Sequence, residues 1–231
     1  MSRQSLNQFI SAIGDGLKPK NVVFYGGVND VFNQCPTKIR NLPAYSYETV
    51  IRSKLENTEK QLIFKDIANF VIDPYRAIGR KLNLSYSVPK KLIINNASDD
   101  GYDCFINPKK TNRIAQQLIN NWYTAYLLSK ANGAEFLAIL QPVIYTSNVN
   151  FDYFHQGEKN HMKMIKENFD VVYPEIISEM KKACSKDLDF CNRIIDGTRW
   201  LEKRENVWID DHHLNGEGNR VIATFISNKL N

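Results

Sequence analysis

The stretch Ile209–Asn219 reads IDDHHLNGEGN and holds two of the four histidines in the chain. It sets two carboxylates, Asp210 and Asp211, directly before two imidazoles, His212 and His213. Side chains of these types can bind a metal ion, transfer a proton as a coupled pair, or form a polar loop. Their spacing is what distinguishes these three chemistries.

A metal ion is the weaker interpretation of this stretch. Neighbouring side chains in extended structure point in opposite directions, so His212 and His213 are not expected to converge on one ion. The sequence has no HxxxH pair and no third ligand at a familiar spacing. We therefore expect no metal at these residues.

Proton transfer fits the spacing better. Asp210 and His213 are three residues apart, so a turn can bring the carboxylate against the imidazole. A carboxylate bonded to Nδ1–H fixes the tautomer and leaves Nε2 free to act as a base. Asp211 and His212 would then face solvent or neighbouring loops. A purely structural role for the Asp-x-x-His pattern stays open at this point.

A second polar cluster, Gly26-Gly27-Val28-Asn29-Asp30, follows the apolar run NVVFY. The side-chain amide of Asn29 beside Gly27 is suited to donate a hydrogen bond to a developing oxyanion. The alternative is that this cluster is a simple turn, because Gly, Asn and Asp all favour turns.

The elements that must position these clusters are predicted from hydrophobic periodicity. Short apolar runs predict buried strands at 22–25, 136–140 and 207–209, and amphipathic patterns predict helices at 6–17, 111–132, 160–183 and 219–230. An irregular helical segment at 45–95, interrupted by Pro74 and Pro89, predicts an insertion into a single domain of residues 1–231. This order is typical of an α/β fold with a parallel sheet, whose functional groups gather beyond the C-terminal strand ends.

Composition narrows the function classes. The chain has 231 residues, of which 43% are hydrophobic and 24% charged, and its net charge is +5. These values are ordinary for a globular protein, and the lysines are spread along the chain without a nucleic-acid motif. No apolar run approaches the length that spans a bilayer. We therefore expect no nucleic-acid partner and no transmembrane segment in this chain.

The four cysteines form no CxxC or CxxH pair, which disfavours a zinc site. Cys184 and Cys191 bracket a short loop and could form one disulfide, and Cys35 and Cys104 could form another across the central segment. Four reduced thiols in a cytosolic protein are the alternative. Localisation stays open: periplasmic or extracellular if an upstream signal or anchor exists, and cytoplasmic otherwise.

Both clusters resemble sequence blocks of the SGNH/GDSL hydrolases. FYGGVND resembles the third block of that family, and IDDHHLNGEGNRVIA resembles the fifth, in which Asp-x-x-His precedes a helix. The intervening NNWYTAYLLSKANGAEFLAILQPVIYT resembles the helix and the LQP-ending strand of a bacterial branch. The resemblance covers most of residues 1–45 and 95–231.

The resemblance implies a flavodoxin-like, three-layer α/β/α sandwich with a five-stranded parallel sheet. It implies hydrolysis of acyl or O-acetyl esters, with a small molecule or a bacterial glycan as the substrate, and no cofactor. His213 would be the base and Asp210 its orienting carboxylate. Asn29 would donate to the oxyanion hole together with a backbone glycine from a second block. That block is not found here, and Gly27, beside Asn29, is the glycine that this sequence offers for the oxyanion hole.

The family's nucleophile is a serine in a Gly-Asp-Ser or Gly-Gly-Ser block, and this block is not found in the sequence. Gly14-Asp15-Gly16 follows no predicted strand, and its glycines are accounted for by the end of the preceding helix. Ser2 and Ser5 are expected at a mobile terminus, and Cys35 lies in no setting that would activate it. The nucleophile stays unknown.

Without that block, the resemblance predicts an N-terminally incomplete domain that is inactive as given, because loss of the serine costs roughly 10⁶ in rate. It also predicts an open sheet edge that a partner could join. The alternative function is a non-catalytic descendant of the family that binds a glycan or another protein.

Overall fold

The computed structural model describes residues 2–37, 101–149 and 156–230. The helices are α1 Ser2–Gly14, α2 Val28–Gln34, α4 Pro108–Ala131, α5 Gln156–Lys186, α6 Leu188–Cys191 and α7 Gly216–Leu230. The strands are β1 Asn21–Gly26, β2 Glu135–Leu140 and β3 Ile194–Asp196, and they form one parallel sheet in the order β1-β2-β3. The fold is α/β with an all-parallel sheet, as the sequence predicts.

The chain divides into two compact units. The first comprises residues 1–44 and 100–231, and the second comprises residues 45–99. The predicted helical insertion at 45–95 lies outside the described residues. The described residues belong to the first unit.

Local sequence signals explain where α4 begins and ends, and the apolar pattern of α1 can be compared with its packed face. Asn107 caps the start of α4 by accepting a hydrogen bond from the backbone amide of Lys110, and Pro108 occupies the first turn. Gly133, with φ of 70°, follows the end of α4 in a conformation that glycine tolerates best. On α1 Leu6 and Phe9 are buried, whereas Ile10 of the same apolar pattern is 47% exposed, so the periodicity predicts the packed face only in part.

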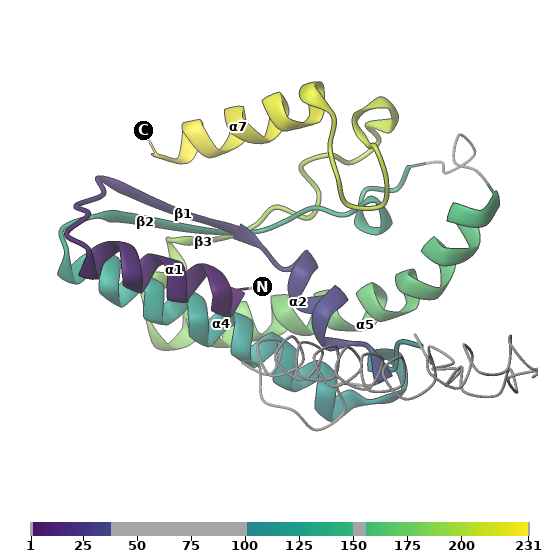
Figure 1. Cartoon of the computed structure of the whole chain (residues 1–231), viewed down its shortest axis with the longest axis horizontal. Coiled ribbons are helices and arrows are strands. Elements are labelled where there is room, and N and C mark those ends of the chain that lie inside the picture. The colour runs from purple at the N-terminus through teal and green to yellow at the C-terminus, as the bar shows by residue number, and fades with distance from the viewer. Residues whose placement is uncertain (1, 38–100, 150–155, 231) are drawn as a thin grey trace, which may run out of the picture. The chain divides into compact units, whose positions relative to one another are not determined.

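The two faces of the sheet pack against different hydrophobic clusters. Val22 and Phe24 of β1 point into the larger cluster, which includes buried side chains of α1, α4 and α5. Tyr25 contacts the smaller cluster, to which α7 contributes Val221 and Ile222. Figure 1 shows α1, α4 and α5 on one side of the strands and α7 on the other. Each face of the described sheet therefore has a helix over it.

The third predicted strand, at 207–209, is wrong. Glu205–Val207 is a turn of 3-10 helix, and Trp208 makes only an isolated bridge to Leu214. Ile209 is 63% exposed, so the apolar run VWI does not continue into the core. The third strand is instead Ile194–Asp196, which pairs with β2. Two adjacent isoleucines before an aspartate give too short an apolar run to distinguish this strand from a loop.

A disulfide links Cys35 to Cys104, which lie on either side of residues 38–100 in the sequence. The Cα atoms of the two cysteines are 5.2 Å apart. The backbone amide of Thr37 also donates to the carbonyl of Gly101, at 2.8 Å. Next to this junction the buried Lys110 ammonium lies 2.6 Å from Asp103. A second disulfide links Cys184 to Cys191. Both candidate pairings are therefore present, and no cysteine thiol is free.

None of the helices within the described ranges combines the length and the apolar character needed to cross a membrane.

Candidate functional site

The loop that contains the two acids and two histidines is a tight turn with Asp210 at its centre. One carboxylate oxygen of Asp210 accepts hydrogen bonds from the backbone amides of His212 and His213, at 2.9 and 2.7 Å. The base of the turn closes where the Ile209 amide donates to the His213 carbonyl, at 2.8 Å. An aspartate that binds the amides two and three residues ahead is a common way to hold such a turn.

The same turn brings Asp210 against the imidazole of His213. The second carboxylate oxygen, Oδ2, lies 2.7 Å from His213 Nδ1. The His213 side chain is 64% exposed and that of Asp210 is 43% exposed. The pair predicted from the three-residue spacing therefore forms a hydrogen bond at the surface.

Asp211 and His212 form a second pair, which the sequence did not anticipate. Asp211 Oδ1 lies 2.6 Å from His212 Nδ1, and Asp211 Oδ2 accepts a 2.7 Å hydrogen bond from the Tyr145 hydroxyl. The side chains of His212 and Asp211 are only 22% and 9% exposed. Of the two surroundings expected for these residues, solvent or a neighbouring loop, Asp211 has the second, because it is buried and bonded to Tyr145 in the segment that follows β2.

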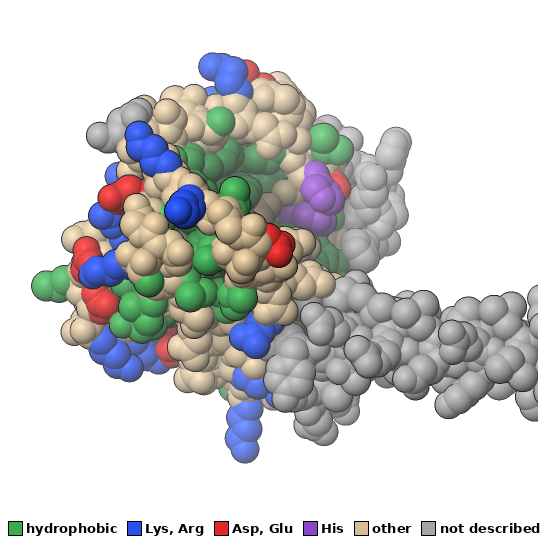
Figure 2. All heavy atoms as spheres, turned by 60° about the vertical axis from the view of Figure 1, so that its left-hand side comes forward, with side chains coloured by type: hydrophobic (Ala, Val, Ile, Leu, Met, Phe, Trp, Pro, Cys, Tyr) green, Lys and Arg blue, Asp and Glu red, His purple; other side chains and the backbone are tan. Residues whose placement is uncertain are grey.

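The two imidazoles also lie side by side, with ring centroids 4.0 Å apart. This contradicts the prediction that His212 and His213 point in opposite directions. That prediction assumed extended backbone, whereas the Asp210 turn curls the chain. Figure 2 shows histidine side chains gathered at the surface beside acidic and hydrophobic ones.

In setting the pKa of His212 and the pKa of Asp210, hydrogen bonds and nearby charges outweigh burial. Burial alone would lower the pKa of His212, but the hydrogen bond to Asp211 and the charges of Asp211 and Asp210 raise it above its usual value. Burial alone would raise the pKa of Asp210, but its bonds to the His212 amide and to the His213 ring and amide lower it. Both shifts favour the charged forms of these side chains.

Between β1 and α2, Gly27 is the N-cap residue of α2, with φ of 118°, a conformation that only glycine adopts readily. A Cβ atom at this position would also lie 2.6 Å from the Leu140 side chain. Asn29, in the first turn of α2, is exposed. Asp30 is buried, and burial raises the pKa of its carboxyl, an effect that hydrogen bonds from Ser2 partly offset.

The direction of the Gly27 amide follows from a neighbouring hydrogen bond. The Gly26 carbonyl accepts from the Gln141 amide, at 2.9 Å, and so points toward β2. Because the peptide unit is planar and trans, the Gly27 N–H points the opposite way, toward the edge of the sheet beyond β1. No other described strand pairs with β1 at that edge.

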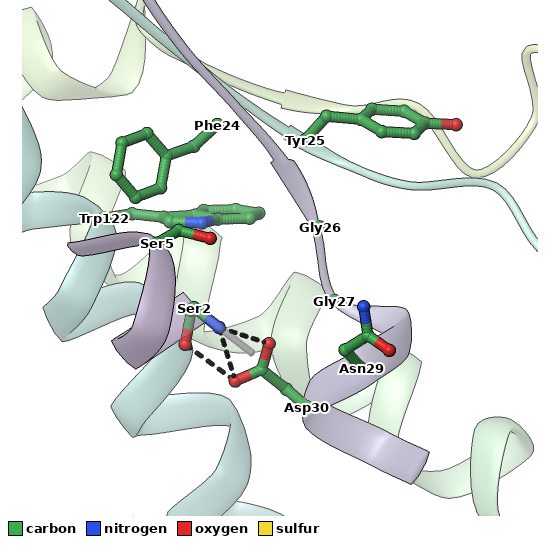
Figure 3. A pocket seen from close by; sticks show the side chains of 9 residues that line it. All are labelled: Ser2, Ser5, Phe24, Tyr25, Gly26, Gly27, Asn29, Asp30 and Trp122. Atoms are coloured by element: carbon green, nitrogen blue, oxygen red, sulfur yellow. Dashed lines mark hydrogen bonds between the residues drawn. The ribbon is translucent and has the colours of Figure 1, made fainter. Parts of the chain in front are cut away.

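Figure 3 shows a small pocket at this edge, with Asp30 directed toward Ser2 and Asn29 directed away from that pair. Asp30 accepts bonds from the Ser2 amide and hydroxyl, the latter at 2.7 Å, and Asn121 donates to the same hydroxyl. Gly27 and Asn29 also line the pocket, whose volume of about 50 Å³ is far below that of a substrate cleft. Its size suits a single small group or a water molecule.

The three positions considered for a nucleophile have other surroundings. Ser2 is 6% exposed and bonded to Asp30, so its expected place at a mobile terminus is wrong. Ser5 lines the pocket of Figure 3. Cys35 is disulfide-bonded and has no thiol. The imidazole of His213 bonds to Asp210, and within the described ranges no serine hydroxyl bonds to it.

Gln141 and Phe32 connect the two predicted clusters. Gln141 follows β2; its amide binds the Gly26 carbonyl, and its side chain donates to the His212 carbonyl, at 3.4 Å. The Phe32 ring lies one helical turn after Asn29 and packs on the His212 ring, with centroids 4.7 Å apart. The clusters therefore meet beyond the C-terminal ends of β1 and β2, as expected for a parallel sheet.

Sequence reasoning missed Gln141 and Tyr145 as parts of this site. A signal was present, because both residues lie in the segment LQPVIYT, directly after a predicted strand. The rule that selects Asn29 after β1 also selects polar side chains after β2.

The chain matches no family model, no curated protein and no solved structure. The resemblance to SGNH/GDSL hydrolases therefore rests on the sequence blocks and stays a prediction.

Proposed function

We propose that this chain carries the base, its orienting carboxylate and the oxyanion donors of an SGNH/GDSL-type ester hydrolase with a Ser-His-Asp mechanism. The observation that carries the proposal is the 2.7 Å contact between Asp210 Oδ2 and His213 Nδ1 on an exposed loop. The proposed substrate class is an acyl or O-acetyl ester of a small molecule or a glycan. The fold proposed with it is the three-layer sandwich of that family.

In the proposed reaction, His213 Nε2 takes the proton of a serine hydroxyl as its oxygen attacks the ester carbonyl. Asp210 holds Nδ1–H and stabilises the imidazolium that results. The imidazolium then returns the proton to the departing alcohol, which leaves an acyl-serine. Water, deprotonated by the same imidazole, releases the carboxylic acid and restores the serine.

The negative charge that develops on the carbonyl oxygen needs donors that are already oriented. The Gly27 amide and the Asn29 side-chain amide are proposed for this role. The Gly27 N–H points toward the open side of β1, and Asn29 is exposed one turn before Phe32, which touches the histidine loop. Loss of one such donor typically lowers the rate by about 10²–10³.

The nucleophile is proposed to come from a polypeptide segment that pairs with the free edge of β1. A parallel strand at that edge would end beside Gly27, since parallel strands present their C-terminal ends at one side of a sheet. The carbonyls of Lys20 and Gly26 accept hydrogen bonds from Glu135 and Gln141 and so point toward β2. The alternating residue Val23 therefore directs its amide toward the edge at which no described strand pairs.

The test begins with the coding DNA upstream of Met1, which is translated in all frames and searched for a serine block. The longest product is then assayed with p-nitrophenyl acetate and labelled with a fluorophosphonate that reacts with activated serines. We expect turnover and one labelled serine outside the 231 residues, with both signals lost in His213→Ala. Absence of any serine block, with no turnover and no labelling, would rule the proposal out.

A matched control separates loss of the base from loss of folding. His161→Ala removes a histidine that the proposal does not use, and it should retain both turnover and labelling. His213→Ala should keep the circular dichroism spectrum and melting temperature of the parent protein, because the His213 side chain is largely exposed. A parallel loss in both variants would contradict an assigned role for His213.

A non-catalytic function, the binding of a glycan or of another protein, is the second candidate. The edge of β1 at which none of the described strands pairs favours it. In that case no serine is labelled, and the chain associates through its edge. Val23→Pro removes the edge-facing amide and should then abolish concentration-dependent association measured by light scattering. Association that survives this substitution would contradict an edge-mediated function.

A further inference from the structure

Asp210, His212 and His213 form a compact group of metal-ligand side chains. One ligand atom from each residue lies within 4.8 Å of the other two. Within the described ranges, it is the one set of three or more histidine, cysteine or carboxylate side chains whose ligand atoms lie this close together. The spacing is within reach of a single ion after small side-chain rotations, since ligand bonds of about 2 Å place tetrahedral ligands some 3.3 Å apart.

A second layer of protein groups holds these side chains in place. Asp211 binds Nδ1 of His212, and Tyr145 donates to the far oxygen of Asp211. Carboxylate–imidazole pairs of this kind orient histidine ligands in metal sites, and they leave Nε2 as the nitrogen available to an ion. The Phe32 ring also restricts the His212 ring.

We propose that Asp210, His212 and His213 bind one divalent transition-metal ion of the zinc type. Two imidazoles and one carboxylate suit Zn²⁺, Ni²⁺ or Cu²⁺, whereas Mg²⁺ and Ca²⁺ prefer oxygen ligands only. The ion would keep a coordination position open to solvent, because the side chains of His213 and Asp210 are 64% and 43% exposed. A site with three protein ligands and an open position binds water or an anion as the fourth ligand.

Metal binding and the proposed ester hydrolysis exclude each other at His213. An ion bound to Nε2 occupies the lone pair that accepts the serine proton, and an ion bound to Nδ1 displaces Asp210. This consequence rests on the proposed function, but the binding of the ion does not. The same loop would then hold the enzyme inactive while the ion is bound.

Titration calorimetry of the chain with Zn²⁺, after removal of metals with a chelator, tests the site. We expect one ion per chain, no comparable heat with Mg²⁺, and proton release on binding as pH falls toward 6. His212→Ala and His213→Ala should each weaken binding at least tenfold. The double variant His155→Ala/His161→Ala, which removes the other two histidines, should bind as the parent does.

Asp211→Asn tests whether the buried carboxylate acts as an outer-layer partner. It should weaken Zn²⁺ binding by about 10–100-fold without changing the stoichiometry. Circular dichroism of each variant establishes that it is folded, and Tyr145→Phe provides a milder change in the same layer. The proposal is overturned if His212→Ala binds as tightly as the parent, or if the His155/His161 variant loses the site.

Calorimetry also keeps this inference separate from the function proposed above. If the longer product that carries a serine block binds Zn²⁺ but shows no ester turnover in chelator, the result supports the site and counts against the hydrolase. Turnover that Zn²⁺ does not inhibit, in a protein that binds no Zn²⁺, counts against the site alone. Inhibition by Zn²⁺ that a chelator reverses supports both.

Discussion

Two aspartate–histidine pairs lie within four consecutive residues, and they differ in exposure and support. In the Asp210–His213 pair the side chains are 43% and 64% exposed, and backbone amides of the same turn hold the carboxylate. In the Asp211–His212 pair the side chains are 9% and 22% exposed. Tyr145 and Phe32, from other parts of the chain, hold this second pair.

This difference separates the pair that can reach a substrate from the pair that positions the loop. A base must present its free nitrogen to a reacting group, which an exposed imidazole can do without rearrangement. A buried carboxylate with two hydrogen-bond partners instead links its loop to the sheet. On this interpretation Asp211 and His212 are positioning residues, and Asp210 and His213 carry the proposed chemistry.

The largest effect is expected from removing the base. In the product that carries the nucleophile, His213→Ala should lower kcat by about 10⁴–10⁶, because loss of the histidine of a Ser-His-Asp mechanism has such consequences. His212→Ala should lower kcat far less and act mainly on stability. Steady-state rates with p-nitrophenyl acetate, measured in chelator, compare the two variants.

The opposite ranking of these variants would reverse the comparison. It would assign the proton transfer to His212, whose ring packs against Phe32 of α2 at the Asn29 end of the site. Equal losses would mean that the two imidazoles act as one unit.

A second test exchanges each carboxylate for its amide. Asp210→Asn should lower kcat by about 10³–10⁴, since the wrong histidine tautomer is then favoured. The KM should change little, because Asp210 binds His213 rather than the ester. Asp211→Asn should affect kcat by less than tenfold, and circular dichroism must first establish that this variant is folded. A larger kcat loss in Asp211→Asn would transfer the orienting role to the buried pair.

The sequence predicted the aspartate–histidine contact of the exposed pair but not that of the buried pair. Asp210 and His213 are local in sequence, so their spacing alone predicts their contact. Asp211 depends on Tyr145, which lies 66 residues away, and no local pattern reports that contact. The strands at 21–26 and 135–140 were predictable because each is a continuous apolar run, whereas Ile194–Asp196 is too short to stand out.

Stability should respond more strongly at the buried pair. Tyr145→Phe removes a donor to the buried Asp211 carboxylate and should lower the free energy of unfolding by about 1.5–3 kcal/mol. Tyr123→Phe is the matched control, because its hydroxyl also donates to an aspartate, Asp187, but at the surface. The control should change stability by no more than about 0.5 kcal/mol. Urea denaturation measures both, and equal effects would contradict a stabilising role for the buried pair.

The smallest effect is a change in how stability depends on pH. The folded-state pKa of His212 is raised by Asp211 and Asp210, against the opposing effect of burial. Its charged form therefore contributes stability that is fully present below pH about 6.5 and is lost as pH rises through the folded-state pKa. The other titratable groups facing this imidazole are His213 and, through Asp211, Tyr145.

The free energy of unfolding of the parent should therefore exceed that of His212→Gln by more at pH 5.5 than at pH 8.5. Asp210 contributes in a different window, because its lowered pKa makes its stabilisation disappear only as pH falls below about 4. Measurements between pH 5.5 and 8.5 thus leave Asp210 ionised throughout. A difference that is constant over this range would mean that Asp211 orients His212 without stabilising its charge, which would leave burial alone to distinguish the two pairs.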